Sequence, residues 1–390
     1  MDWMHTLCRF LPTPCLLAVL LASGVQAQVS FCPMGTTVAG EPIIPDALSA
    51  NGLVVAGRAL GASTATTSGD RPVLWTASGG VQELAPVFGL QRPYVRAISG
   101  DGSTIAVDGD GHAYTWSAAH GRREFLPLSG DVDVLMQGMS HDGSIVQGAS
   151  YRLGRGYHSV IWRPDGTSTD LSTTANPSVG PVGEVQPWGL SADGSVATGW
   201  YNPSNSPGSA PYRWTPSGGM VPLPMLGQLY GAAAGISPDG NVCVGYSSGP
   251  GGASAVRWIG DSMVEDLGSF PGADLSIAFL ASTGGEVIVG EYDGPAASFR
   301  PWIWTRSTGM LDLSAFLSSS GVDLTGWSLI ASPRGLSADG NTLVGIGTHE
   351  YAPGLFRTEG WMATIPSPAP WMLFGAAAIC SRAVRRPIRS

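Results

Sequence analysis

The sequence predicts an all-β fold, a β-propeller of seven four-stranded blades that an N-terminal strand closes into a ring. Three observations predict it. Glycine and proline supply 55 and 30 of the 390 residues, whereas charged residues make up only 13%. A unit recurs along the chain at intervals of 41 to 55 residues, the length of one propeller blade. Each unit contains a tight turn and a tryptophan at comparable places.

The composition excludes several other classes of protein. Hydrophobic residues, at 43%, are sufficient to bury a core, so the chain is not intrinsically disordered. The glycines follow no three-residue period, which excludes collagen, and the glycine and proline content opposes a helical bundle. All 20 basic residues are arginine and the net charge is −9. This balance argues against nucleic acid as a partner.

The segment 1–27 is expected to be a secretory signal peptide. Arg9 precedes a short apolar run at 16–22, and Val25-Gln26-Ala27 has the small residues of a cleavage site. The apolar run is shorter than the roughly 20 residues that span a bilayer. We therefore expect cleavage after Ala27, with an N-terminal membrane anchor as the alternative.

The segment 366–390 has the organisation of a sorting or anchoring tail. Pro366-Ser367-Pro368 begins a proline segment, which an apolar run at 371–380 follows. The basic end contains Arg382, Arg385, Arg386 and Arg389. A basic end of this kind stops transfer across the membrane.

This order of features resembles the PEP-CTERM sorting signal of Gram-negative and related bacteria, with Ser367 in place of the family's central Glu. The resemblance implies that an exosortase-type enzyme cleaves at the proline motif; a plain C-terminal membrane anchor is the alternative. The body at 28–365 keeps 28 acidic and 15 basic residues, a net charge of −13. That charge suits a soluble exported protein that meets the membrane only through its tail.

Three landmarks define the repeats of the body. The first is a Ser-x-Asp-Gly turn, which begins at Ser49, Ser99, Ser140, Ser191, Ser237, Ser282 and Ser337, with Asn in the first turn and a degenerate sixth. The second is a glycine five residues after the turn, replaced only in the second repeat, by Val107. The third is a tryptophan, found at Trp75, Trp116, Trp162, Trp214, Trp258, Trp304 and Trp361. A leucine follows the tryptophan by nine residues, or by ten in the second repeat, at Leu126.

The fifth repeat illustrates the four expected strands, at 232–237, 241–245, 255–258 and 263–267. Asp239-Gly240 supplies the positive φ of the first hairpin turn. Trp258 and Leu267 are expected to fill the space between neighbouring blades. The loop between the second and third strands absorbs the differences in length and is where binding is expected to vary.

The seventh repeat predicts how the ring closes. After Trp361 only four residues precede the proline segment, so its fourth strand is missing. The stretch 29–44 contains the strand-like Thr36-Thr37-Val38, and such a strand would complete the last blade and remove an open edge. Six or eight blades, or an open superhelix, are the alternatives.

The repeats also resemble the HAF repeat of bacterial extracellular proteins, a pattern close to Ile-Ser-x-Asp-Gly-x-x-Val-x-Gly followed by a tryptophan. The segments 235–245 and 335–345 fit it closely, and the resemblance covers 46–365. It implies an extracellular protein. That family carries no established activity, so the resemblance implies no catalytic residue and no cofactor.

Few residues form a candidate chemical site. Asp108 and Asp110 lie in a Gly-rich segment superficially similar to a calcium loop, but the acids of an EF-hand are missing and a compact hairpin is the alternative. The histidines show no metal-ligand spacing. Cys32 and Cys243, the cysteines of the body, are not expected to form a disulfide.

Four aromatic residues outside the framework are candidate ligand contacts. Tyr151 and Tyr157 fall in the variable loop of the third repeat, and Trp200 with Tyr201 begins that of the fourth. Exposed aromatic rings commonly hold sugars, whereas local packing is the alternative.

The leading functional hypothesis is a non-enzymatic exported protein of the cell surface or extracellular matrix. Its expected partners are the exosortase-type enzyme and extracellular polysaccharide or surface proteins. A lectin-like propeller is the first alternative. A polysaccharide hydrolase or lyase with channel carboxylates is the second.

Overall fold

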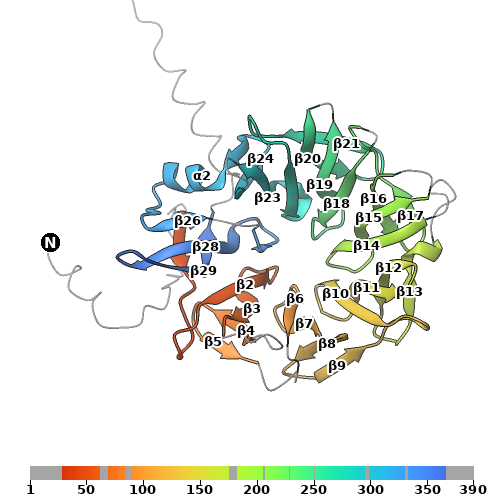
Figure 1. Cartoon of the computed structure of the whole chain (residues 1–390), viewed down its shortest axis with the longest axis horizontal. Helices are drawn as coiled ribbons and strands as arrows, with labels where there is room; N and C mark the ends of the chain where they lie inside the picture. The colour runs from red at the N-terminus through yellow and green to blue at the C-terminus, as the bar shows by residue number, and fades with distance from the viewer. Residues whose placement is uncertain are drawn as a thin grey trace, which may run out of the picture.

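The computed structural model describes residues 29–61, 69–84, 90, 92–174, 182–204, 207–227, 229–249, 251–294, 298–329 and 333–365. These residues form seven antiparallel sheets arranged as blades in a ring (Figure 1). The innermost strands and turns line a central channel. The predicted fold class is therefore confirmed. The expected signal cleavage site at Ala27, the Pro366-Ser367-Pro368 motif and the four terminal arginines lie outside the described residues.

Six blades are four-stranded meanders in sequence order. The first three contain β2 (Ile43–Leu48), β3 (Val54–Ala59), β4 (Arg71–Thr76), β5 (Gly80–Glu83); β6 (Tyr94–Ile98), β7 (Thr104–Gly109), β8 (His112–Ser117), β9 (Gly121–Phe125); and β10 (Asp133–Met139), β11 (Val146–Arg152), β12 (Gly156–Trp162), β13 (Ser168–Asp170). The next three contain β14 (Val182–Leu190), β15 (Ala197–Pro203), β16 (Ala210–Thr215), β17 (Gly219–Pro222); β18 (Gly231–Ile236), β19 (Val242–Gly249), β20 (Gly252–Ile259), β21 (Met263–Gly268); and β22 (Ser276–Ala281), β23 (Val287–Gly294), β24 (Ser298–Thr305), β25 (Gly309–Asp312).

The seventh blade closes the ring with a strand from the N-terminal part of the body. Its order is β1 (Ser30–Pro33), β29 (Leu355–Thr364), β28 (Thr342–Ala352) and β26 (Trp327–Leu329), with β27 (Gly335–Leu336) also paired to β28. Closure by an N-terminal strand is thus confirmed, and the strand lies within the expected stretch 29–44 but not at Thr36-Thr37-Val38. Thr36 forms only an isolated bridge, whereas Phe31 of β1 packs against Trp327 and Trp361 at ring-centroid distances of 5.2 and 5.6 Å.

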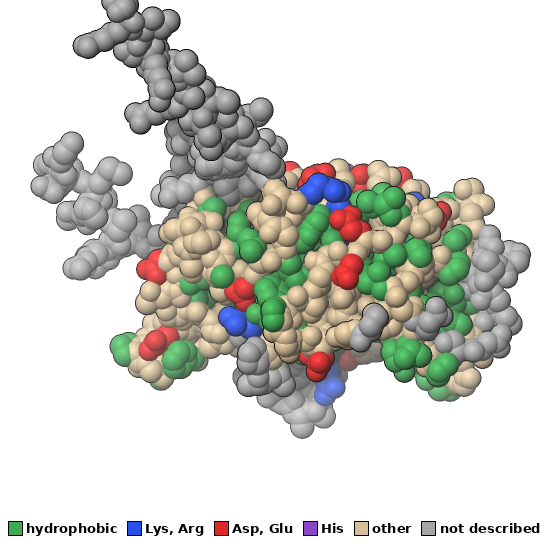
Figure 2. Space-filling view, turned by 90° about the horizontal axis from the view of Figure 1, so that it is seen from above, with side chains coloured by type: hydrophobic (Ala, Val, Ile, Leu, Met, Phe, Trp, Pro, Cys, Tyr) green, Lys and Arg blue, Asp and Glu red, His purple; other side chains and the backbone are tan. Residues whose placement is uncertain are grey.

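Helices are few in this fold. The helix α2 (Leu313–Ser319) follows β25, and the short 3-10 turns η1 (Leu171–Thr174) and η2 (Thr283–Gly285) lie in the third and sixth blades. Within the described ranges, no helix combines the length and the apolar character needed to cross a membrane. Seen from its edge, the ring is a flattened disc on which hydrophobic and charged side chains are scattered in small groups (Figure 2).

The Ser-x-Asp-Gly turns are stabilised by their own side chains. In the fourth blade, the buried Ser191 hydroxyl donates to Asp193 at 2.6 Å and accepts from the N–H of Val196 at 2.9 Å. Asp193 in turn accepts from the N–H of Ser195. Because these bonds satisfy backbone groups that the tight turn leaves unpaired, Ser and Asp recur at these two places.

The turn glycine is required for two reasons. Gly194 has a φ of 71°, in the region that glycine adopts without strain, and a Cβ there would lie 2.6 Å from Ile145 of the preceding blade. The same position in other blades is equally close to the preceding blade. The turn therefore also sets how closely neighbouring blades approach.

The tryptophan and leucine landmarks pack between blades as predicted. Leu84 of the first blade, for example, belongs to one buried cluster with Val95 and Ile105 of the second. The prediction that Leu126 is the packing residue of the second repeat was wrong. Phe125, nine residues after its tryptophan, is buried in the core, whereas Leu126 is 68% exposed. The spacing is therefore nine residues in all of the first six repeats, and in the second repeat an aromatic residue replaces the leucine.

Candidate functional site: the central channel

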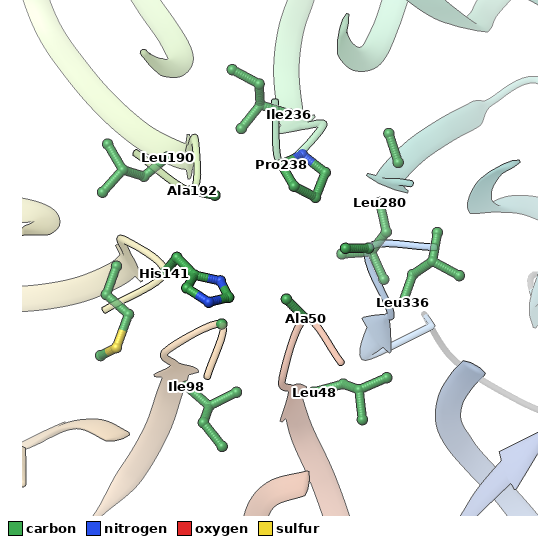
Figure 3. Close-up of a pocket in the computed structure, with 14 residues that line it drawn as sticks. Leu48, Ala50, Ile98, His141, Leu190, Ala192, Ile236, Pro238, Leu280 and Leu336 are labelled. Atoms are coloured by element: carbon green, nitrogen blue, oxygen red, sulfur yellow. The ribbon is translucent and has the colours of Figure 1, made fainter. Parts of the chain in front are cut away.

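The seven turns surround one end of the channel. Ala50, His141, Ala192 and Pro238, each the second residue of its turn, surround the opening (Figure 3). Backbone hydrogen bonds link these turns from blade to blade: Ala338 N–H to Ala50 O, Ala50 to Gly100, Asp101 to His141, His141 to Ala192, Ala192 to Pro238, and Thr283 to Ala338, at 2.6–3.1 Å. Pro238 has no N–H to donate. These bonds therefore link the turns at every boundary between blades except the one between the fifth and sixth.

An aliphatic collar lies directly inside the opening. The residue before each turn serine contributes one side chain, and the collar consists of Leu48, Ile98, Met139, Leu190, Ile236, Ala281 and Leu336. These residues border a cavity of about 170 Å³ on the turn side. Most of them also border a larger cavity of about 400 Å³ on the other side. The collar thus separates an apolar opening from the deeper part of the channel.

The larger cavity is lined by residues that β-bulges turn toward the channel. In six blades the pairing of the two innermost strands shifts register three residues before the turn serine, as between Pro45 and Ala47. A bulge leaves its extra residue unpaired and redirects the side chain. The bulge ring, as we name it, consists of Asp46, Arg96, Gln137, Trp188, Ala234, Phe279 and, at the equivalent place in the seventh blade, Arg334.

The bulge ring has two chemically different arcs. Arg334, Asp46 and Arg96 come from three consecutive blades, the seventh, first and second, and form a charged arc. Trp188, Ala234 and Phe279 come from the fourth, fifth and sixth blades and form an apolar arc. Gln137 of the third blade lies between the two arcs on one side, and on the other side Phe279 and Arg334 come from adjacent blades. The channel is therefore polar on one side and aromatic on the other.

Arg58 supports the charged arc from the second strand of the first blade. Its guanidinium donates two hydrogen bonds to the Asp46 carboxylate, at 2.8 and 3.2 Å, and one to Asp70 at 3.2 Å. Burial raises the pKa of Asp46 above its ordinary value, and the bonds from Arg58 oppose that rise. Arg58 therefore holds the Asp46 carboxylate in place while it also bonds to Asp70.

Arg96 is held in the same way by Asp108. Its Nε lies 2.9 and 3.0 Å from the two oxygens of Asp108, whose carboxylate also accepts from the N–H of Met136 at 2.9 Å. Burial raises the pKa of Asp108, and the charge of Arg96 opposes the rise. The ring of Tyr94 lies beside both guanidinium groups, 5.0 Å from Arg96 and 6.0 Å from Arg58. Cation–π contacts thus connect the two pairs.

Arg334 differs from these two arginines. Its Nε is buried and has no hydrogen-bond partner within the described part of the chain, where no ion pair of Arg334 occurs either. Its positive charge acts on Asp46, but Arg58 occupies that carboxylate. A buried donor without a partner carries a free-energy cost that a bound anion would remove.

The two calcium candidates do not come together as ligands. Asp108 is 1% exposed and is occupied by Arg96 and Met136. Asp110, with a φ of 53°, and Gly111 form the two-residue turn between β7 and β8. The compact hairpin is therefore the correct interpretation. No group of three or more His, Cys, Asp or Glu side chains within the described ranges is arranged to hold a metal ion.

The aromatic candidates lie on strands rather than in loops. Tyr151 and Tyr157 are cross-strand partners on β11 and β12, with ring centroids 4.9 Å apart, and both are half-buried. Trp200, on β15 of the neighbouring blade, is also half-buried. Tyr201 is 4% exposed and packs in the core, which removes it from the candidate ligand contacts. Cys243 is a buried free thiol, so it forms no disulfide with Cys32.

The sequence interpretation missed the bulge ring, although a signal was present. Three residues before each turn serine, the framework of small and aliphatic residues is interrupted by Asp46, Arg96, Gln137, Trp188 and Phe279. Because the faces of each sheet pack against neighbouring blades, a two-residue alternation does not identify side chains that point into the channel. Only the bulge places them there.

Comparison with solved structures supports the fold. Oligogalacturonate lyase in complex with manganese is 12% identical, with a TM-score of 0.54, over 89% of this chain and 99% of that one. Virginiamycin B lyase from Staphylococcus aureus is 13% identical, with a TM-score of 0.51, over 87% and 100%. No protein-family model matches the chain, and no curated protein sequence matches it.

A third similar structure differs in how its ring is closed. The β-propeller domain of the Trilobed protease from Pyrococcus furiosus is 10% identical, with a TM-score of 0.53, over 82% of this chain and 93% of that domain, and has an open velcro topology. In the present chain β1 pairs with β29 across the closure. At these identities the similarities establish that the chain is a β-propeller.

Proposed function

We propose that this protein is an exported β-propeller that acts without catalysis, as a binding or scaffolding module of the cell surface or extracellular matrix. The observation that supports this best is the bulge ring, in which one variable side chain from each blade converges on a channel with a constant framework. Variable residues on a rigid scaffold are where ligand specificity usually resides.

A non-catalytic role is supported by how the channel uses its carboxylates. A general base must be available to take a proton from a substrate. Asp46 is hydrogen-bonded to Arg58, and Asp108 to Arg96 and a backbone N–H. Each carboxylate therefore serves to position an arginine, which suits binding better than proton transfer.

The two terminal segments of the sequence are the basis for proposing export and anchoring. Cleavage after Ala27 would release the protein from the inner membrane, and an exosortase-type enzyme would process the tail at Pro366-Ser367-Pro368. Cell fractionation followed by intact-mass measurement tests both steps. Full-length protein recovered from the cytoplasm would refute this part of the proposal.

The binding role is tested with the full chain on an array of extracellular polysaccharides and surface proteins. We expect the array to yield a ligand. The variant Trp188→Ala, changed in the channel, should no longer bind this ligand, whereas Trp200→Ala, changed outside the bulge ring, should still bind it. Binding that is insensitive to Trp188 would move the site away from the channel. Turnover of a polymeric substrate that Asp46→Asn abolishes would instead establish a lyase or hydrolase.

A further inference from the structure

The charged arc offers one anion site. Arg58, which supports the arc, bonds to Asp46 and Asp70, and Arg96 of the arc bonds to Asp108. Arg334 lacks such a partner within the described residues, and its Nε is buried at the channel wall. An incoming anion would therefore bind Arg334, because the other two guanidinium groups are already neutralised.

The neighbouring carboxylates restrict the charge of that anion. The negative charge of Asp46 lies within electrostatic reach of Arg334, and Asp70 and Asp108 bond to the neighbouring Arg58 and Arg96. A phosphate with two charges would be repelled by these groups. A carboxylate carries one charge and matches the planar guanidinium fork with two parallel hydrogen bonds. The arc therefore favours a single carboxylate.

The rest of the ligand must suit the remainder of the bulge ring. Trp188 and Phe279 stand on either side of Ala234, whose small side chain leaves room between the two aromatic residues. Gln137 and Arg96 add hydrogen-bonding groups between the two arcs. A flat apolar face bearing hydroxyl groups meets all these conditions, and the cavity of about 400 Å³ has the size of a small-molecule site.

We infer that the channel binds an acidic saccharide, with the carboxylate of a uronic acid residue on Arg334 and the apolar face of a sugar ring against Trp188 or Phe279. This inference rests on the proposed binding function and specifies its ligand class. A neutral sugar would leave Arg334 unpaired.

The test is calorimetric titration of the full chain with a glucuronic acid oligosaccharide and with its carboxyl-reduced counterpart. We expect the acid to bind at least 10-fold more tightly. Arg334→Gln should abolish this preference, and Arg334→Lys should retain part of it. Trp188→Ala should weaken both ligands equally. Arg306→Gln, an exposed arginine of the β24–β25 turn, is the matched control and should change neither affinity.

Three outcomes would overturn the inference. These are equal affinity for the acid and its reduced form, a preference that survives Arg334→Gln in a variant with unchanged thermal unfolding, and failure of both oligosaccharides to bind. In each case the wider proposal stands if the array yields a different ligand that Trp188→Ala releases. It fails if no ligand depends on the channel.

Discussion

Replacing Ser191 with alanine isolates the energetic role of the repeated turn. The hydroxyl is fully buried and makes two hydrogen bonds, one to the Asp193 carboxylate and one from the N–H of Val196. A hydrogen bond to a charged group contributes about 1.5–3 kcal/mol, and a buried N–H left unsatisfied costs about 1–3 kcal/mol. We therefore expect Ser191→Ala to lower the free energy of unfolding by about 3 kcal/mol.

The degenerate sixth turn supplies the matched comparison. Ser282 accepts from the N–H of Val287 at 2.9 Å, but glycine replaces the acid two residues later. Ser282→Ala should therefore cost about half as much, roughly 1.5 kcal/mol. Ser217→Ala, on the exposed β16–β17 turn, should stay within about 0.5 kcal/mol of the wild type. Urea unfolding followed by tryptophan fluorescence measures all three. Equal losses for Ser191→Ala and Ser217→Ala would refute the reasoning.

Three further predictions follow from the same framework. Hydrogen bonds from Ser140 and Ser191 hold the pKa of Asp142 and Asp193 below the ordinary 3.8. The stabilisation that these carboxylates give is therefore complete at neutral pH and is lost as the pH falls below that value. The prediction is contradicted if the urea midpoint does not fall on acidification, or if the midpoint of Asp193→Asn depends on pH as strongly as that of the wild type. Gly194→Ala should cost about 2 kcal/mol more than Gly166→Ala in urea unfolding, because both have positive φ but only Gly194 meets a neighbouring blade. Phe125→Ala should cost about 3–5 kcal/mol and Leu126→Ala almost nothing; the reverse order in thermal unfolding would show that the repeat spacing of nine is not constant.

The repeated turn made the blade number predictable from the sequence. Its Ser and Asp satisfy backbone groups within the turn, and its glycine sets the distance to the preceding blade. The hydrogen bonds form within the turn itself, and a glycine of positive φ ends the turn in every unit, so the spacing of the turns gives the number of blades. The expected strands of the fifth repeat match β18 to β21 for the same reason.

Two features could not be predicted because they depend on tertiary contacts. Thr36-Thr37-Val38 has the β-branched residues of a strand, but the closing strand is the one that brings Phe31 against Trp327 and Trp361. The bulge ring depends on register shifts that the strand sequences do not reveal. Asp46 and Arg334 come from opposite ends of the body, and only closure of the ring makes them neighbours.

The ring of backbone hydrogen bonds implies that the propeller has no special seam where its first and last blades meet. Ala338 donates to Ala50 in the same way that Ala50 donates to Gly100. A circularly permuted chain, cut at the exposed β11–β12 turn, should therefore assemble the same disc. The place at which this backbone link cannot form is Pro238, between the fifth and sixth blades. There the Arg257 side chain of the fifth blade donates to the backbone oxygen of Gly285 in the sixth at 3.2 Å, so a side chain supplies the link that the proline cannot.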